Sequence, residues 1–128
     1  MHALVIDDSR AMRLMLRRIL EGLTFKVTEF SDADSGWAWL QRGGSADIAL
    51  VDWNMPGMSG LEFIRSVRAV NIWEQMFLMM VTSETAPERL RLALDAGADE
   101  YLMKPITPEV LQQKLEILGF RWARETIT

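Results

Sequence analysis

The chain of 128 residues is 49% hydrophobic and 25% charged, which is the size and composition of one compact globular domain. Its net charge of -4 argues against nucleic-acid binding through phosphates, and the lack of cysteine excludes disulfide and thiolate chemistry. The N-terminal apolar stretch is too short for a signal peptide or a membrane span, so the sequence predicts a soluble cytoplasmic protein without a membrane partner.

Five short segments are predicted to be β-strands because their lengths and apolar content are typical of strands. Four are apolar throughout, as in strands that are covered on both faces of a parallel sheet. The other alternates between polar and apolar residues, like a half-exposed edge strand. In chain order the segments are ALVI (3–6), the alternating KVTEF (26–30), IALV (48–51), MFLMMV (76–81) and YLM (101–103).

The segments between these strands carry helical patterns. Apolar residues in 9–23 recur at three- and four-residue spacings, which predicts an amphipathic helix whose arginines form a solvated face. Two less regular helices are predicted at 35–41 and 87–96, the second ended by Gly97. The helical residues predicted to face the core are Met12, Met15, Leu16, Ile19, Leu20, Leu23, Phe63, Ile64, Val67, Val110, Leu111, Leu115 and Leu118.

Two further helices have recognisable starting signals. Ser59 and Glu62 have the spacing of a capping box, in which each side chain bonds to the other residue's backbone N–H. Thr107 can cap the last helix, and Pro108 then occupies the first helical position, where its missing N–H has no cost.

The repeated alternation of strand and helix predicts right-handed parallel crossovers and a three-layer α/β domain. In such a sheet the C-terminal ends of the strands lie along one edge, which is where ligands bind in open α/β folds. Polar residues follow four of the five predicted strands, so they are predicted to converge at this edge. They are Asp7, Asp8, Asp52, Thr82 and Lys104.

The carboxylates in this set indicate a cation site. Three carboxylates in one cleft repel one another and need a cation if all are to remain ionised. Oxygen ligands favour Mg2+, whereas zinc would require cysteine or histidine, and the one histidine of the chain is at position 2. Residues 55–58 predict a type II turn, which would free the backbone carbonyl of Asn54 as a further ligand.

A carboxylate held beside Mg2+ and an ammonium group is suited to attack phosphorus and form an aspartyl phosphate. Phosphoryl transfer needs in-line positioning and neutralised equatorial oxygens. We therefore predict that Asp52 attacks, that Lys104 and Thr82 hold the phosphoryl oxygens, and that the small Ser83 leaves the entrance open.

Four motifs, VIDDS, LVDWNMPGMSGLEFIR, MVTSE and YLMKPI, resemble those of the receiver domain of bacterial two-component response regulators, in its single-domain, CheY-like type. The resemblance covers residues 3–118. It implies a flavodoxin-like (βα)5 fold with strand order 2-1-3-4-5. It places the receiver domain at residues 1–120 and leaves 121–128 as a C-terminal extension without a separate output domain.

The resemblance also implies a role for each matching residue. Asp52 corresponds to the phosphoacceptor, and the phosphate-binding and switch residues correspond to Thr82, Lys104 and Tyr101. The Mg2+ ligands correspond to Asp7, Asp8, Asp52 and the main-chain carbonyl of Asn54. The residues that flank the site are Trp53, Ser83, Glu84 and Pro105.

Several of these residues have finer roles in the family. Tyr101 resembles the aromatic residue that changes rotamer as the switch hydroxyl moves toward the phosphoryl group. Asn54 and Glu84 occupy positions that set the lifetime of the phosphate, and the bond before Pro105 is expected to be cis. Trp53 follows the phosphoacceptor and is expected to sense the electrostatics of the site.

A phosphorylation-operated signalling module of this kind is not expected to be an enzyme with a separate substrate, although it catalyses its own phosphorylation and slow dephosphorylation. The implied partners are a sensor histidine kinase or phosphotransfer protein as donor, and an unidentified output protein at the surface of the fourth helix, fifth strand and fifth helix. Trp73 and residues 121–128 depart from the family pattern, and each could serve a partner or have no role. A chemotaxis-like pathway is plausible.

Two other classes of protein remain as alternatives. A Mg2+-dependent phosphohydrolase would also use an aspartyl phosphate, but such enzymes commonly have a second acid two residues after the nucleophile, where this chain has Asn54. A flavodoxin-like cofactor carrier would have a phosphate loop rich in Ser, Thr and Gly after the first strand, whereas Asp7 and Asp8 would repel a phosphate there.

Overall fold

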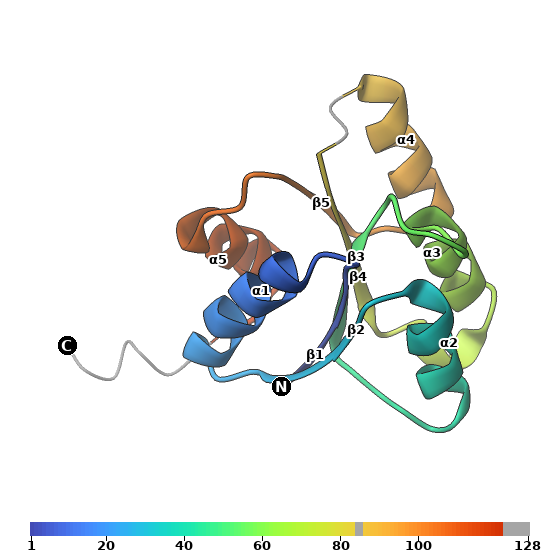
Figure 1. Ribbon diagram of the computed structural model, residues 1–128, viewed down its shortest axis with the longest axis horizontal. Coiled ribbons are helices and arrows are strands. Elements are labelled where there is room, and N and C mark those ends of the chain that lie inside the picture. Colours follow the sequence, from blue (N-terminus) through green and yellow to red (C-terminus); the bar gives the residue numbers. More distant parts are fainter. Residues whose placement is uncertain (84–85, 122–128) are drawn as a thin grey trace.

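Five parallel strands form the centre of the molecule, in the order β2-β1-β3-β4-β5 (Figure 1). The computed structural model describes residues 1–83 and 86–121. The strands are β1 (His2–Ile6), β2 (Lys26–Phe30), β3 (Ile48–Asp52), β4 (Phe77–Thr82) and β5 (Glu100–Met103). The helices are α1 (Arg10–Gly22), α2 (Ala33–Gln41), α3 (Gly60–Arg68), α4 (Pro87–Ala96) and α5 (Pro108–Ile117), with a short 3-10 helix, η1 (Asn71–Trp73), before β4.

Helices cover both faces of the sheet, with α1 and α5 on one side and α2, α3 and α4 on the other (Figure 1). Side chains that alternate along each strand feed two separate cores. On β1, for example, Ala3 and Val5 join the core under α1 and α5, whereas Leu4 and Ile6 join the core under α2, α3 and α4. This arrangement confirms the predicted flavodoxin-like, three-layer (βα)5 fold and its strand order.

The predicted helix signals act as expected. Ser59 and Glu62 form the reciprocal bonds of a capping box at the start of α3, and the Thr107 side chain accepts a bond from the Val110 N–H at the start of α5. Gly97 ends α4 in the left-handed conformation, with φ of 118°. One start was placed too late, because α2 begins at Ala33 and not at residue 35.

The earlier start of α2 is explained by a helix N-cap at Asp32, which the sequence analysis did not predict. Asp32 accepts a bond from the Ser35 N–H at 2.7 Å, and this bond lowers the pKa of the Asp32 carboxyl. Strand β4 is likewise displaced by one residue from the predicted 76–81, because its pairing with β5 extends to Thr82.

Two residues predicted to face the core are exposed instead. Met15 is 40% exposed beside a shallow groove between α1 and the segment that leads into α5. Val110 is 39% exposed and lines a groove between α4 and α5. In both helices the apolar residues extend around a wider arc than the sheet covers, so the outermost ones remain in contact with solvent.

The sequence predicted that the arginines of α1 form a solvated face, but two of them are paired with another element. Arg13 and Arg17 both form ion pairs with Glu29 on the edge strand β2, with N–O distances of 3.1 Å and 2.6 Å. Arg10 and Arg18 are exposed, as predicted.

No helix within residues 1–83 and 86–121 is both long enough and apolar enough to cross a lipid bilayer.

Candidate functional site

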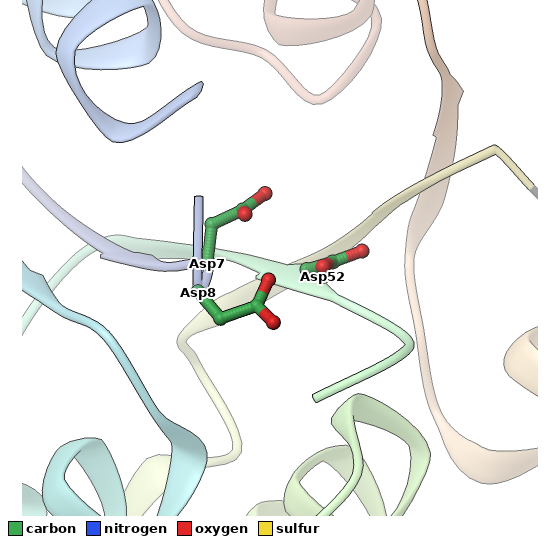
Figure 2. Close-up of side chains that lie close together, drawn as sticks. All are labelled: Asp7, Asp8 and Asp52. Carbon is green, nitrogen blue, oxygen red and sulfur yellow. The ribbon is translucent and has the colours of Figure 1, made fainter. Parts of the chain in front are cut away.

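Three carboxylates meet at the C-terminal edge of the sheet. Asp7 and Asp8 follow β1, and Asp52 is the last residue of the neighbouring strand β3. The parallel register pairs Ile6 with Val51, so Asp7 and Asp52 leave adjacent strands at the same level. Carboxylate oxygens of the three residues lie within 4.8 Å of one another. Figure 2 shows the three side chains grouped together.

Gly60 allows α3 to begin directly against the end of β3. Its N–H donates to the Trp53 carbonyl at 3.0 Å, and a Cβ atom at position 60 would collide with the backbone oxygen of Asp52. The loop between them is also held from the side, since the Met58 N–H donates to the Asp34 side chain at 3.2 Å. These contacts define where the Asp52 backbone lies.

Lys104 lies between two of the carboxylates. Its Nζ is 3.2 Å from Asp7 Oδ2 and 3.4 Å from Asp52 Oδ1. The backbone helps to place it, because the Lys104 N–H donates to the Thr82 carbonyl at 2.9 Å and the following bond to Pro105 is cis, as the resemblance implied. The ammonium group is thus shared by the two buried acids.

The electrostatics of the site are unfavourable for an ionised Asp52. Burial raises the pKa of the Asp52 carboxyl, and the charge of Asp7 raises it further, whereas Lys104 acts in the opposite direction. The Asp52 residue is 7% exposed and Asp7 is 1% exposed, while Asp8 lies open to solvent. One ammonium therefore faces three carboxylates, and a divalent cation would balance the remaining charge.

The donor set fits Mg2+, which prefers oxygen ligands and commonly uses one or two carboxylates with water and phosphate oxygens. Three carboxylates with closely spaced oxygens provide such a set. Asn54 is exposed on the loop beside them, as expected for the residue at which the chain leaves the strand. Whether its carbonyl contributes to a cation site stays a prediction.

The remaining predicted residues surround this cluster. Thr82 is fully buried at the end of β4, and Tyr101 is buried on β5, opposite Met80. Ser83 and Pro105 are exposed at the strand ends. Glu84, which was expected to influence the lifetime of the phosphate, lies outside the described residues.

Trp53, the residue directly after Asp52, is shielded from solvent. It is buried in the core under α2, α3 and α4, and the guanidinium carbon of Arg89 lies 5.1 Å from the centre of its ring. The sequence analysis did not predict the contact of Arg89 with Trp53 or that of Asp34 with Met58. Nothing in their spacing along the chain connects them with the site, because both reach it only through tertiary packing.

A sequence model of the response regulator receiver domain matches residues 3–116. The chain belongs to this receiver domain family. Among its relatives, the chain is 40% identical over 121 residues to the chemotaxis protein CheY homolog of Campylobacter jejuni, covering 93% of each chain. It is 36% identical over 119 residues to the chemotaxis protein CheY1 of Helicobacter pylori, covering 92% of this chain and 96% of that protein.

Solved receiver structures agree with this assignment. The chemotaxis response regulator CheY4 of Vibrio cholerae superposes with a TM-score of 0.85 at 32% identity, covering 91% of this chain and 97% of the other. A CheY-like receiver domain protein from Methanospirillum hungatei superposes with a TM-score of 0.82 at 30% identity, covering 91% of each chain.

Membership of the family establishes the general class of function. Receiver domains of the CheY type are signalling proteins of two-component systems, which interact with histidine kinases or phosphotransfer proteins and with output proteins, and they are generally Mg2+-dependent. The alternative of a phosphohydrolase has no comparable support.

Proposed function

We propose that this receiver domain accepts a phosphoryl group on Asp52 and uses it to change a partner-binding surface. The observation that supports the proposal best is the position of Asp52, whose carboxylate is buried at the edge of the sheet with the Lys104 ammonium 3.4 Å away and two further carboxylates beside it. Burying an acid beside two other carboxylates costs free energy, which supports a chemical role for Asp52 over a purely structural one.

In the proposed reaction, an Asp52 carboxylate oxygen attacks the phosphorus of a phosphohistidine on the donor protein. The new O–P bond forms from an oxygen lone pair as the P–N bond breaks, and the electrons of that bond leave with the imidazole, which takes up a proton. The product is an acyl phosphate on Asp52. Lys104 remains near the transferred group and offsets its negative charge.

Asp7, Asp8 and Asp52 would hold Mg2+, with the carbonyl of Asn54 as a further ligand. When bound, the cation neutralises charge that develops on the phosphoryl oxygens. The chain's own contribution is to orient the nucleophile: the start of α3 fixes the Asp52 backbone, and burial keeps bulk water away from the acceptor oxygen.

Phosphorylation changes the acceptor from about -1 to about -2, which need only bias two conformations by a few kcal/mol to produce a signal. Thr82 and Tyr101 are the proposed switch residues. Thr82 is the last residue of β4, and Tyr101 lies within the neighbouring strand β5 and lines the groove that separates α4 from α5. This groove, of about 630 Å³, is lined by side chains from α4, β5 and α5 and is the proposed site of an output protein.

The biological setting is part of the proposal. The donor is a sensor histidine kinase or phosphotransfer protein, the site of action is the cytoplasm, and neither nucleic acid nor membrane is a direct partner. The named chemotaxis relatives support a chemotaxis-like output. Residues 1–120 are proposed to be the receiver domain, and 121–128 an extension, of which 122–128 lie outside the described residues.

Incubation with Mg2+ and a small-molecule phosphodonor tests the function. Intact mass should show one added phosphoryl group on the wild type and none on Asp52→Asn, which keeps the shape of the side chain but removes the nucleophile. Asp95→Asn, which changes an exposed acid on α4, should be labelled like the wild type. Labelling of Asp52→Asn at the same site would contradict the proposal.

Turnover distinguishes a receiver from a phosphohydrolase. A receiver should accept one phosphoryl group and release it slowly, so phosphate esters should not be consumed over many cycles. Sustained multiple turnover of such esters, lost in Asp52→Asn, would instead favour the phosphohydrolase.

A further inference from the structure

Arg13 connects α1 to the backbone of the acidic site. Its Nη1 donates to the main-chain carbonyl of Asp7 at 2.7 Å, while its Nε lies 3.1 Å from Glu29 Oε1 on β2. The side chain is 15% exposed, so both contacts lie in a partly desolvated position. Arginine suits this task because its planar group offers several donors in a rigid arrangement.

Glu29 is itself firmly held. Arg17, one turn further along α1, contacts the second oxygen of Glu29 at 2.6 Å. This bond is the main reason that the pKa of Glu29 lies below its ordinary value, and the bond from Arg13 adds to the effect. Glu29 is therefore a stable carboxylate that orients the guanidinium of Arg13.

The carbonyl that Arg13 holds belongs to the peptide between Asp7 and Asp8. A peptide unit is planar and contains the Cα atoms of both residues, so holding its oxygen restricts where the two acid side chains start. The preceding peptide, between Ile6 and Asp7, is held from the strand side, where the Asp7 N–H donates to the Phe30 carbonyl at 3.2 Å. Arg13 supplies the contact on the helix side.

We propose that Arg13 is a positioning residue for divalent-cation binding, acting by orienting the peptide that joins Asp7 and Asp8. The inference rests on the proposed cation site at these residues. Arg13 does not touch the cation or the phosphoryl group; its effect passes through the backbone. Groups that orient ligands from outside typically change metal affinity by about 10- to 100-fold when they are removed.

Mg2+ titration of the purified protein by calorimetry tests this role. Arg13→Met keeps most of the aliphatic volume but loses both polar contacts, and we expect about a tenfold or larger loss of Mg2+ affinity. Arg13→Lys can still donate to the Asp7 carbonyl but cannot bond to Glu29 at the same time as arginine does. Its Mg2+ affinity should therefore lie between that of the wild type and that of Arg13→Met. Arg18→Met removes the same charge from an exposed position of α1 and should bind Mg2+ like the wild type.

A second variant separates positioning from simple stability. Glu29→Gln leaves Arg13 in place but weakens its orientation, so it should lower Mg2+ affinity by less than Arg13→Met does. Saturating Mg2+ should restore the phosphorylation of Arg13→Met by a small-molecule donor, because Asp52 and Lys104 are unchanged. A purely structural role would alter the urea midpoint while leaving the Mg2+ affinity of the folded protein unchanged.

The outcomes for the two proposals are distinct. Folded Arg13→Met with wild-type Mg2+ affinity would overturn the role of Arg13 and leave the cation site intact. If Arg13→Met does not fold, the other two variants decide. Wild-type Mg2+ affinity in both Arg13→Lys and Glu29→Gln would also overturn the role of Arg13. A wild-type protein that binds no Mg2+ would overturn the cation site itself, and this inference with it.

Discussion

Asp52 shows how the requirements of chemistry and folding conflict at a single residue. Its carboxylate is buried beside Asp7, and both features raise its pKa above the ordinary value. Lys104 compensates for part of this cost at a distance of 3.4 Å. The residue therefore stores unfavourable free energy in the folded protein, which a divalent cation or a proton would relieve.

Asp52→Asn should stabilise the protein at neutral pH in metal-free buffer. Because the pKa is raised on folding, the folded state binds the proton of Asp52 more tightly than the unfolded chain, and stability is lost as the pH rises through the folded pKa. Asparagine does not titrate, so the variant avoids this loss. We expect a gain of about 1 kcal/mol in the free energy of unfolding, at the low end for removal of a buried charge.

Urea unfolding of both proteins across the acid range checks the sign. The pH-dependent part of the gain should shrink as the pH falls, and should vanish below the ordinary carboxyl pKa of 3.8, where Asp52 is protonated in both states. Asp95→Asn serves as the exposed control. A variant less stable than the wild type at neutral pH would show that the pair with Lys104 outweighs burial.

At the residue scale, the sequence predicted the acids and the lysine but not the groups that position them. The convergence of Asp7, Asp52 and Lys104 follows from the ends of parallel strands, which local patterns reveal. Arg13 was interpreted as a solvated residue because its helical periodicity says nothing about Glu29 on another element. Contacts of that kind depend on how elements pack together.

At the scale of elements, the junction of β3 and α3 controls the geometry of the acceptor. Ser59 caps α3 through the capping box, and the first residue of the helix, Gly60, packs against the backbone of Asp52. A helix that began further from β3 would lose this contact and leave the end of the strand less constrained. Glycine at this position is a requirement of close approach between two backbones.

Gly60→Ala should destabilise the protein because the new Cβ would collide with the backbone oxygen of Asp52. Overpacking against a rigid backbone typically costs about 1–3 kcal/mol. Gly22→Ala is a matched control, since nothing lies within 4 Å of the new Cβ there. It should leave stability unchanged or raise it by up to about 1 kcal/mol. Thermal unfolding of the two variants would refute this account if they lost equal stability.

The types of the elements and their order were predictable from the sequence. Which apolar helix residues remain exposed was not. Periodicity identified the helices that contain Met15 and Val110, but both side chains face grooves between neighbouring elements. The pattern of a helix gives the direction of its apolar face, and only the packing of its neighbours determines how much of that face is covered. The missed cap at Asp32 was visible in the sequence and could have been used.

At the scale of the whole molecule, Arg68 joins several elements at the edge of the sheet opposite to Asp52. It donates to the carbonyls of Gly97 and Trp73, at 3.0 Å and 3.2 Å, and pairs with Asp99 at 2.6 Å. Asp99 also accepts a bond from the Leu78 N–H at 2.8 Å. This one side chain therefore connects α3 with η1, with the end of α4 and with the start of β5.

Arg68→Met should lower the free energy of unfolding by about 1–3 kcal/mol, because it removes the donor to the Gly97 carbonyl and the charged partner of Asp99. Arg65→Met, on an exposed position of the same helix, should have a smaller effect. Mg2+ affinity of folded Arg68→Met should equal that of the wild type, since the two edges of the sheet are separate. A large loss of affinity would show that the two edges are coupled.

The whole fold should be more stable when Mg2+ is present. The carboxylates come together only in the folded chain, so the cation binds the folded state in preference to the unfolded state. Mass action predicts a gain of about 2.7 kcal/mol at a Mg2+ concentration 100-fold above the dissociation constant. Thermal unfolding with increasing Mg2+ measures this gain directly.

The same titration in Asp8→Asn and Asp52→Asn tests the origin of the gain. Each variant removes one carboxylate and part of the repulsion, so in metal-free buffer neither should be less stable than the wild type, and both should gain less from Mg2+. Acidic pH should reduce the gain in the wild type as well, because protons compete with Mg2+ for the carboxylates. If both variants gained as much from Mg2+ as the wild type, the cation would be acting elsewhere on the acidic surface, and the three-carboxylate site would have to be abandoned.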